Sequence, residues 1–231
     1  MNEKEFVLAL EKVNIHLNEK QLQQFSQYAD LLEQWNQKMN LTAITQRDQI
    51  YEKHFYDSIV PFTQMNFETF CDVGTGAGFP GVPVQIVWPE KKVTLIEPLQ
   101  KRCRFLQEVK DQLSLSMEIV NQRSEEAVHQ YREVFDVVTS RAVARLTILL
   151  ELCTPLLKKE GILVALKGKG AMEELENAQH AMKVLHLEAK EIKEVQVDDA
   201  MHQNIYFKKT QKTDPKYPRN YGQIKKKPLG E

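Results

Sequence analysis

The spacing of apolar residues divides the chain into two parts. Up to about residue 65, apolar side chains recur at helical intervals, first over residues 6–17 and then over residues 22–39. Asn18 and Gln21 form a capping pair just before the second of these helices. A third helix is predicted to begin after Asp48. Because no strand is predicted here, we expect residues 1–65 to form an N-terminal helical extension.

From Thr69 onward the period changes, and short apolar runs alternate with amphipathic helical segments. Five such alternations predict a mostly parallel sheet with helices on both faces, because parallel strands need crossover connections. The last two runs have no helix between them and are expected to pair antiparallel at one edge. The predicted fold is therefore α/β, Rossmann-like, with a mostly parallel seven-stranded sheet over residues 66–209 and a basic C-terminal tail over residues 210–231. The predicted strands span residues 69–73, 92–97, 117–120, 135–140, 161–168, 187–197 and 203–210.

The composition is that of an ordinary soluble protein. Hydrophobic residues make up 42% and charged residues 27% of the chain. No apolar run approaches the roughly 20 residues that span a bilayer, and the N-terminus is acidic and polar rather than a basic leader. We therefore expect a cytoplasmic protein with no membrane partner. Its three cysteines are far apart in apolar surroundings, which favours reduced core thiols over disulfides or a metal site. They are Cys71, Cys103 and Cys153.

Charge is distributed unevenly although the formal net charge is only −1. Residues 208–231 hold eight Lys or Arg against two acidic residues, a balance of +6, whereas the rest of the chain has a balance of −7. Clustered cations displace counterions from phosphates, and interleaved tyrosines can stack on unpaired bases. The pattern is typical of a polyanion contact, although a solvated tail would look similar.

A cluster of glycines follows the first predicted strand. The stretch DVGTGAGFPG, residues 72–81, contains four of the nine glycines of the chain. Gly76, Gly78 and Gly81 have the GxGxxG spacing that usually indicates a dinucleotide site. In a doubly wound sheet, a loop at this position lies at the ligand crevice.

The residues around the glycines argue for a different ligand. Asp72 would repel a pyrophosphate, and Pro80 and Pro83 remove N–H donors that a pyrophosphate would need. A carboxylate instead suits a cation, and S-adenosyl-L-methionine offers a sulfonium and an ammonium group. The loop therefore contributes the candidate cofactor-binding residues Asp72, Gly74, Gly76 and Gly78.

Further candidates follow the next strands. Glu97 ends the second predicted strand, where an acid can accept the hydroxyls of a ribose, although it could also cap the helix that begins near Leu99. Ser124 and Glu125 follow the third strand, where an adenine ring could lie. Arg141 ends the fourth strand and could hold a phosphate, a base edge or the cofactor carboxylate.

The sequence offers no clear catalytic base. There is no Asn/Asp-Pro-Pro-aromatic run, which would prepare an exocyclic amine for methylation, and no Pro-Cys loop for attack on a pyrimidine. These absences favour a target atom that is nucleophilic without losing a proton. His54 is the tempting base, but a packed or capped histidine is the simpler interpretation. The catalytic residues therefore stay unassigned.

Several segments together resemble the RsmG methyltransferases, once called glucose-inhibited division protein B. They occur in the family's order and spacing and are NLTAIT, HFYDS, DVGTGAGFPG, VTLIEP, RSEE, VTSRAVA and ALKG. The resemblance implies a class I S-adenosyl-L-methionine-dependent methyltransferase that modifies N7 of a guanine in the 530 loop of bacterial 16S ribosomal RNA. It implies that Gly74, Phe79, Ser124, Glu125 and Arg141 bind the cofactor.

If the substrate is ribosomal RNA, as the resemblance implies, the cations near the crevice and in the tail are candidates for RNA contact. The expected partner is 16S ribosomal RNA or the small ribosomal subunit, and we expect a monomer without a metal. Two other hypotheses stay open: an NAD(P)-binding oxidoreductase, and a non-enzymatic RNA-binding ribosome-assembly factor. The candidate RNA-binding residues are Arg141, Lys167, Lys169, Arg219, Lys225, Lys226 and Lys227.

Overall fold

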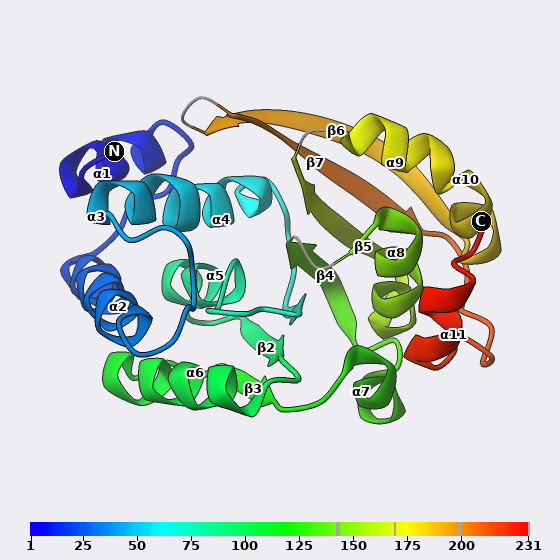
Figure 1. Ribbon diagram of the computed structural model, residues 1–231. Helices are drawn as coiled ribbons and strands as arrows, with labels where there is room; N and C mark the ends of the chain where they lie inside the picture. Colours follow the sequence, from blue (N-terminus) through cyan, green and yellow to red (C-terminus); the bar gives the residue numbers. More distant parts are fainter. Residues whose placement is uncertain (142–143, 169, 198–199, 231) are drawn as a thin grey trace.

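A seven-stranded sheet lies between two layers of helices (Figure 1). The computed structural model describes residues 1–141, 144–168, 170–197 and 200–230. The strand order is β3-β2-β1-β4-β5-β7-β6. The first five strands are parallel, and β7 is antiparallel to both β5 and β6. The strands are β1 (Thr69–Val73), β2 (Lys92–Ile96), β3 (Glu118–Val120), β4 (Phe135–Arg141), β5 (Leu157–Lys167), β6 (Leu187–Val197) and β7 (Ala200–Lys209).

All seven predicted strands are confirmed, as is the antiparallel pair at one edge. The chain order reverses between β1 and β4, because the chain leads outward from β1 to β3 and then returns to the other side of β1. Ligand crevices of open α/β sheets form at such a switch point, beyond the carboxyl ends of the strands.

Alternating side chains of the strands contribute to two hydrophobic cores. In β1, Phe70 belongs to one core and Cys71 to the other, as the two-residue period of a strand requires. The first core includes α5 (Gly81–Val87) and α6 (Gln100–Leu113). Helices cover both faces, as predicted. The second core includes α7 (Ser124–Tyr131), α8 (Leu146–Cys153), α9 (Ala171–Asn177) and α10 (Gln179–Val184).

The N-terminal extension is helical, as predicted, with different boundaries. The first helix ends at Glu11, because the chain turns at Asn14, whose φ of 61° is left-handed. The predicted capping pair is present, since Asn18 and Gln21 exchange hydrogen bonds of 2.9 Å at the start of the second helix. The third predicted helix is a chain of short helical segments. The elements are α1 (Glu3–Glu11), α2 (Glu19–Asn36), α3 (Arg47–Gln49), a π-helix (Ile50–Tyr56), α4 (Asp57–Ile59) and a 3₁₀ turn (Val60–Phe62).

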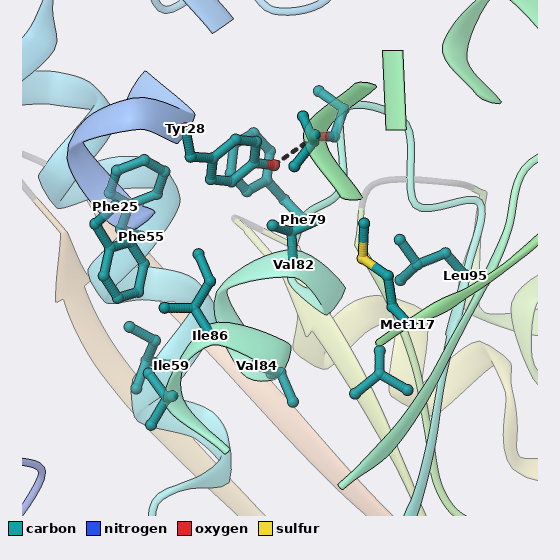
Figure 2. Packing of buried hydrophobic residues seen from close by; sticks show 14 of the residues in the cluster. Phe25, Tyr28, Phe55, Ile59, Phe79, Val82, Val84, Ile86, Leu95 and Met117 are labelled. Carbon is teal, nitrogen blue, oxygen red and sulfur yellow. Dashed lines mark hydrogen bonds between the residues drawn. The ribbon is translucent and has the colours of Figure 1, made fainter. Parts of the chain in front are cut away.

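This extension shares its core with the sheet layer. Phe25, Tyr28 and Phe55 are almost fully buried; Tyr28 and Phe55 pack against Phe79 of the glycine loop, and Phe25 packs against Phe55 (Figure 2). The Tyr28 hydroxyl donates a hydrogen bond to the Ala77 carbonyl, drawn as a dashed line in Figure 2. The extension therefore supports the loop directly.

The C-terminal segment also packs on the α/β core. It contains α11 (Tyr221–Lys226), whose Ile224 is buried against Ile148 and Leu152 of α8. In Figure 1, α11 (red) lies beside α8. The basic segment is thus anchored, although Lys225, Lys226 and Lys227 are exposed.

Within the described ranges, no helix is long and apolar enough to cross a membrane, and no cluster of three or more His, Cys, Asp or Glu could hold a metal ion. The three cysteines are buried free thiols.

Candidate functional site

A cavity of about 520 Å³ opens beyond the carboxyl ends of β1, β2 and β4. It lies at the predicted switch point and receives residues from three parts of the chain: the extension, the glycine loop, and the ends of the strands with α6. Its lining residues are Leu41, Thr42, His54, Gly74, Thr75, Gly76, Ala77, Phe79, Glu97, Pro98, Leu99, Arg102 and Arg141.

The glycines divide into two groups. Gly74 and Gly76 line the cavity with φ values of 69° and 61°, a conformation that only glycine adopts easily. Gly78 and Gly81 do not line it. A Cβ at Gly78 would lie 2.7 Å from the Tyr28 hydroxyl, and one at Gly81 would lie 2.1 Å from a Leu95 methyl group. Close packing around the loop therefore requires glycine at these two positions.

Six N–H groups of the loop are already engaged within the protein. Those of Gly74 and Thr75 donate to the Ile96 carbonyl, and those of Gly78 and Phe79 donate to the Thr75 carbonyl. Gly76 donates to a Glu97 carboxylate oxygen at 2.9 Å, and Gly81 to an Asp72 oxygen at 2.9 Å. A pyrophosphate would find these six donors occupied, so the GxGxxG spacing does not form a dinucleotide cradle.

Asp72 anchors the loop from beneath. Its Oδ2 accepts hydrogen bonds from the Thr75 hydroxyl at 2.6 Å and from the Gly81 amide at 2.9 Å. The residue is fully buried and does not line the cavity, and its Oδ1 has no partner among the described residues. Burial raises the pKa of this carboxyl to about 6. The structure thus places Asp72, a candidate cofactor-binding residue, beneath the loop rather than in the lining of the cavity.

Glu97 is the carboxylate that faces the cavity. It is only 1% exposed, and its Oε1 accepts a hydrogen bond from the Leu99 amide at 2.9 Å while its Oε2 accepts from Gly76. Arg102 Nη1 lies 3.7 Å from Oε2. The capping role expected for Glu97 is confirmed at the turn into α6, and the same carboxylate lines the cavity just after β2.

Arg141 provides a cation at the end of β4. Its guanidinium lies 4.9 Å from the centre of the Phe79 ring, and its Nη1 lies 3.5 Å from Asp57 Oδ2. Its Nη2 lies 3.3 Å from Nδ1 of His54. These contacts hold the guanidinium at the cavity wall.

The extension supplies a wall that sequence reasoning did not assign to the site. Leu41 and Thr42 belong to the NLTAIT segment, and His54 belongs to HFYDS. Both segments contributed to the family resemblance, but the sequence did not show that they line a cavity. His54 is packed, as expected from the sequence: its ring stacks on Phe79 with centroids 4.2 Å apart. Burial and the charge of Arg141 lower its pKa to about 3, although the Lys53 carbonyl opposes the shift. The imidazole is therefore neutral at ordinary pH.

Other lining residues adjoin predicted ones and were also missed. Thr75 and Ala77 lie between the glycines, and Pro98, Leu99 and Arg102 follow Glu97. The sequence around these residues does not distinguish a cavity-lining position from an ordinary turn or the start of a helix.

Several predicted residues lie away from this cavity. Ser124 and Glu125 begin α7 and do not line it. Lys167 is 8% exposed and contacts Glu174 at 2.7 Å, and Arg219 binds both carboxylate oxygens of Glu151 at 2.9 and 2.6 Å. These two cations are already paired. Lys169 lies outside the described residues.

Comparison with known proteins gives a consistent family match. The profile of a family described as rRNA small subunit methyltransferase G matches residues 21–205. A protein of Lysinibacillus sphaericus named ribosomal RNA small subunit methyltransferase G is 45% identical over 237 residues, covering 99% of this chain and 100% of its own length. A protein of the same name from Bacillus velezensis is 44% identical and is covered over 99% of both chains.

Two solved structures share the fold at low sequence identity. M. jannaschii TYW2 in complex with AdoMet superposes with a TM-score of 0.57 at 15% identity, covering 72% of this chain and 79% of that one. The precorrin-6y C5,15-methyltransferase of Geobacter metallireducens has a TM-score of 0.53 at 12% identity, with coverages of 73% and 90%. The sheet and its flanking helices therefore have the class I methyltransferase fold.

Proposed function

The chain belongs to the rRNA small subunit methyltransferase G family, and from this premise we propose that it transfers a methyl group from S-adenosyl-L-methionine to N7 of a guanine in the 530 loop of 16S ribosomal RNA. The observation that carries the proposal is the cavity beyond β1, β2 and β4, where Glu97 and Arg141 line the same 520 Å³ as Gly74 and Gly76. This volume is within the usual range for a small-molecule site.

The lining residues fit the proposed cofactor. Glu97 retains lone pairs on both oxygens that can accept ribose hydroxyls, and Arg141 can bind a carboxylate. Gly74 and Gly76 let a ligand approach the backbone closely. We assign cofactor contact to these residues and Phe79, and we assign Asp72 and Gly78 to support of the loop. The occupied loop amides favour this cofactor over a nicotinamide dinucleotide.

The chemistry of the target requires no base. When bound, the cofactor supplies a methyl group on a sulfonium, and guanine N7 accepts it with its free lone pair while the carbon–sulfur bond breaks. No proton leaves the base. His54 agrees with this scheme, because a neutral imidazole that contacts Arg141 is a poor proton acceptor. The protein acts by orienting the partners, an effect that can lower a barrier by about 7–11 kcal/mol.

The RNA surface that we propose is narrower than the set of cations in the sequence. Lys225, Lys226 and Lys227 are exposed at the end of α11 and can contact phosphates. Arg123 lies 5.3 Å from the Tyr221 ring of the same helix and adds an exposed cation. We omit Lys167 and Arg219, whose charges are paired within the protein.

We further infer that the protein works as a monomer in the cytoplasm, where ribosomal RNA is found.

Methylation of defined substrates tests the proposal. Small subunits and naked 16S RNA from cells that lack the protein are incubated with purified protein and labelled S-adenosyl-L-methionine, and the modified base is mapped by mass spectrometry. One 7-methylguanine in the 530 loop is expected. Glu97→Ala should abolish cofactor binding and methylation together, while Glu68→Ala, which removes an exposed acid far from the lining, should change neither.

Two results would overturn the proposal in different directions. Micromolar binding of NADH without binding of S-adenosyl-L-methionine would select the oxidoreductase. Full cellular function of the Glu97→Ala variant, despite its loss of cofactor binding, would select the non-enzymatic assembly factor.

A further inference from the structure

Three side chains form a hydrogen-bonded chain along one wall of the cavity. Nη2 of Arg141 lies 3.3 Å from Nδ1 of His54, and Nε2 of His54 lies 2.7 Å from Oγ1 of Thr42. The chain connects the end of β4, the π-helix and the NLTAIT segment. Each of the three residues also lines the cavity.

The direction of these hydrogen bonds follows from the chemistry of arginine. A guanidinium only donates, so Nδ1 of His54 must accept. A neutral imidazole that accepts at Nδ1 carries its proton on Nε2, and Nε2 therefore donates to Thr42 Oγ1. The His54 ring is held in this orientation by its stacking on Phe79.

Thr42 accepts a second hydrogen bond, from the Ile44 amide at 3.1 Å. Both lone pairs of its hydroxyl are then used, and only its proton is left to interact. No acceptor for that proton occurs among the residues that the structure describes. The cavity wall thus presents the Thr42 hydroxyl as a donor, and the hydrogen bonds from His54 and the Ile44 amide determine where its proton points.

We propose that Thr42 is a ligand-binding residue of the cavity, whose hydroxyl donates a hydrogen bond to an sp² oxygen of the bound ligand, and that His54 is the positioning residue that reserves the hydroxyl for this role. The inference rests on the proposed function. Two ligands carry such an oxygen: guanine has O6 beside N7, and S-adenosyl-L-methionine has a carboxylate. Adenine has an amine in place of O6, so a fixed donor here disfavours it.

The first experiment separates the two sources of the oxygen. Binding of S-adenosylhomocysteine and of 5′-methylthioadenosine, which lacks the carboxylate, is measured by calorimetry for the wild type, Thr42→Val and Thr42→Ser. A tenfold loss for Thr42→Val with S-adenosylhomocysteine alone assigns the bond to the carboxylate, since about tenfold is what a hydrogen bond of this kind contributes. Thr42→Ser keeps the hydroxyl and should stay within about threefold of the wild type.

The second arm uses RNA fragments with guanine or 2,6-diaminopurine at the target position. If O6 is the acceptor, Thr42→Val lowers kcat/KM about tenfold on guanine, leaves S-adenosylhomocysteine binding unchanged, and narrows the preference for guanine over diaminopurine. Unchanged binding and turnover would overturn the proposal. Equal losses with both nucleosides, or with both RNAs, would also overturn it, because they indicate a merely structural role.

The donor-to-acceptor direction of the hydrogen bonds from Arg141 through His54 to Thr42 can be measured separately. Nitrogen-15 NMR of histidine-labelled protein should show His54 as the neutral Nε2–H tautomer from pH 5 to pH 8, with the signal assigned by its loss in His54→Gln. A proton on Nδ1 would contradict the proposal. This measurement and the binding arm need no RNA, so they remain informative if the wild type fails to methylate ribosomal RNA, which would contradict the proposed function instead.

Discussion

Two carboxylates at the ends of neighbouring strands have different tasks because one lies beneath the glycine loop and the other lies beside it. Asp72 lies beneath the glycine loop and holds it through Thr75 and Gly81. Glu97 lies beside the loop, reaches the cavity, and occupies the amide of Gly76. Sequence spacing places both acids at strand ends, but only the packing of the loop decides which of them lines the cavity.

The buried position of Asp72 predicts a pH-dependent stability. Burial raises its pKa from 3.8 to about 6 in the folded protein. Between these values the folded state keeps a proton that the unfolded state releases, so this group lowers the free energy of unfolding as the pH rises. Asp72→Asn removes the effect. The free energy of unfolding of the variant, measured by urea unfolding relative to that of the wild type, should rise by up to about 3 kcal/mol between pH 4 and pH 7.

Asp136 is the matched control for Asp72. Although burial opposes the shift, hydrogen bonds from Lys158 and Thr69 lower its pKa to about 2. Its stabilisation is present above the unfolded value and is lost only as the pH falls below about 4. The difference between Asp136→Asn and the wild type should therefore be flat from pH 4 to pH 7. A flat profile for Asp72→Asn would contradict the assigned burial of that carboxyl.

At the scale of elements, the first five strands were predictable because each contains a short apolar run bounded by a change of period. The antiparallel edge followed from the missing helix between residues 187–197 and 203–210. The π-helix that contains His54 was not predictable, because apolar spacing over residues 48–59 indicates a helix without specifying which backbone groups pair. The sequence also did not identify Thr42 as a cavity-lining residue, because only tertiary contacts bring this turn to the cavity.

The contact between α2 and the glycine loop predicts that a distant helix tunes the site. The Tyr28 hydroxyl donates to the carbonyl of Ala77, which lines the cavity. Tyr28→Phe leaves that carbonyl without its partner, and we expect a loss of about 1–3 kcal/mol in unfolding free energy. We also expect weaker cofactor binding, because the loop loses its support. Thermal unfolding and calorimetric titration measure the two effects.

Tyr56→Phe provides the same chemical change without the hydrogen bond. Tyr56 is half-buried beside the same core, and its hydroxyl has no hydrogen-bond partner among the described residues. This variant should bind the cofactor as the wild type does. Equal effects of the two substitutions would mean that ring packing, rather than the bond to Ala77, supports the loop.

At the scale of the molecule, the shared core predicts that the extension is not separable. Phe6, Phe25 and Phe55 are at most 1% exposed, and they pack in the core that also contains α5 and α6. A fragment of residues 66–231 would expose this apolar face to water. We expect it to lack the near-UV circular dichroism and dispersed NMR spectrum of a folded protein, or to aggregate.

The same experiment needs a control for chain cleavage itself. A protease site inserted after Asn66, an exposed residue, leaves every element present once it is cut. The two pieces should stay associated through the common core and keep the spectrum of the intact chain. A folded 66–231 fragment that binds S-adenosyl-L-methionine would show that the extension is an independent domain.

The C-terminal lysines predict a local rather than a global electrostatic contribution to RNA binding. Lys225, Lys226 and Lys227 are exposed on a helix that Ile224 fixes to α8, so their charges have a defined place. Each phosphate contact with single-stranded RNA contributes about 0.7 to the slope of log K against log salt concentration. Replacing the three lysines by glutamine should therefore lower that slope by about 2, while cofactor affinity stays unchanged.

A second triple variant distinguishes position from net charge. Lys4, Lys12 and Lys20 are exposed on the extension, and their replacement by glutamine changes the formal charge by the same amount. If the RNA runs along α11, only the C-terminal variant should lose affinity and salt dependence in filter-binding titrations. Salt screens each surface charge beyond about 8–10 Å at physiological ionic strength, so lysines far from the bound RNA should contribute little to its affinity. An equal loss of affinity in both variants would instead show that the net charge of the protein, and not a contact at α11, attracts the RNA.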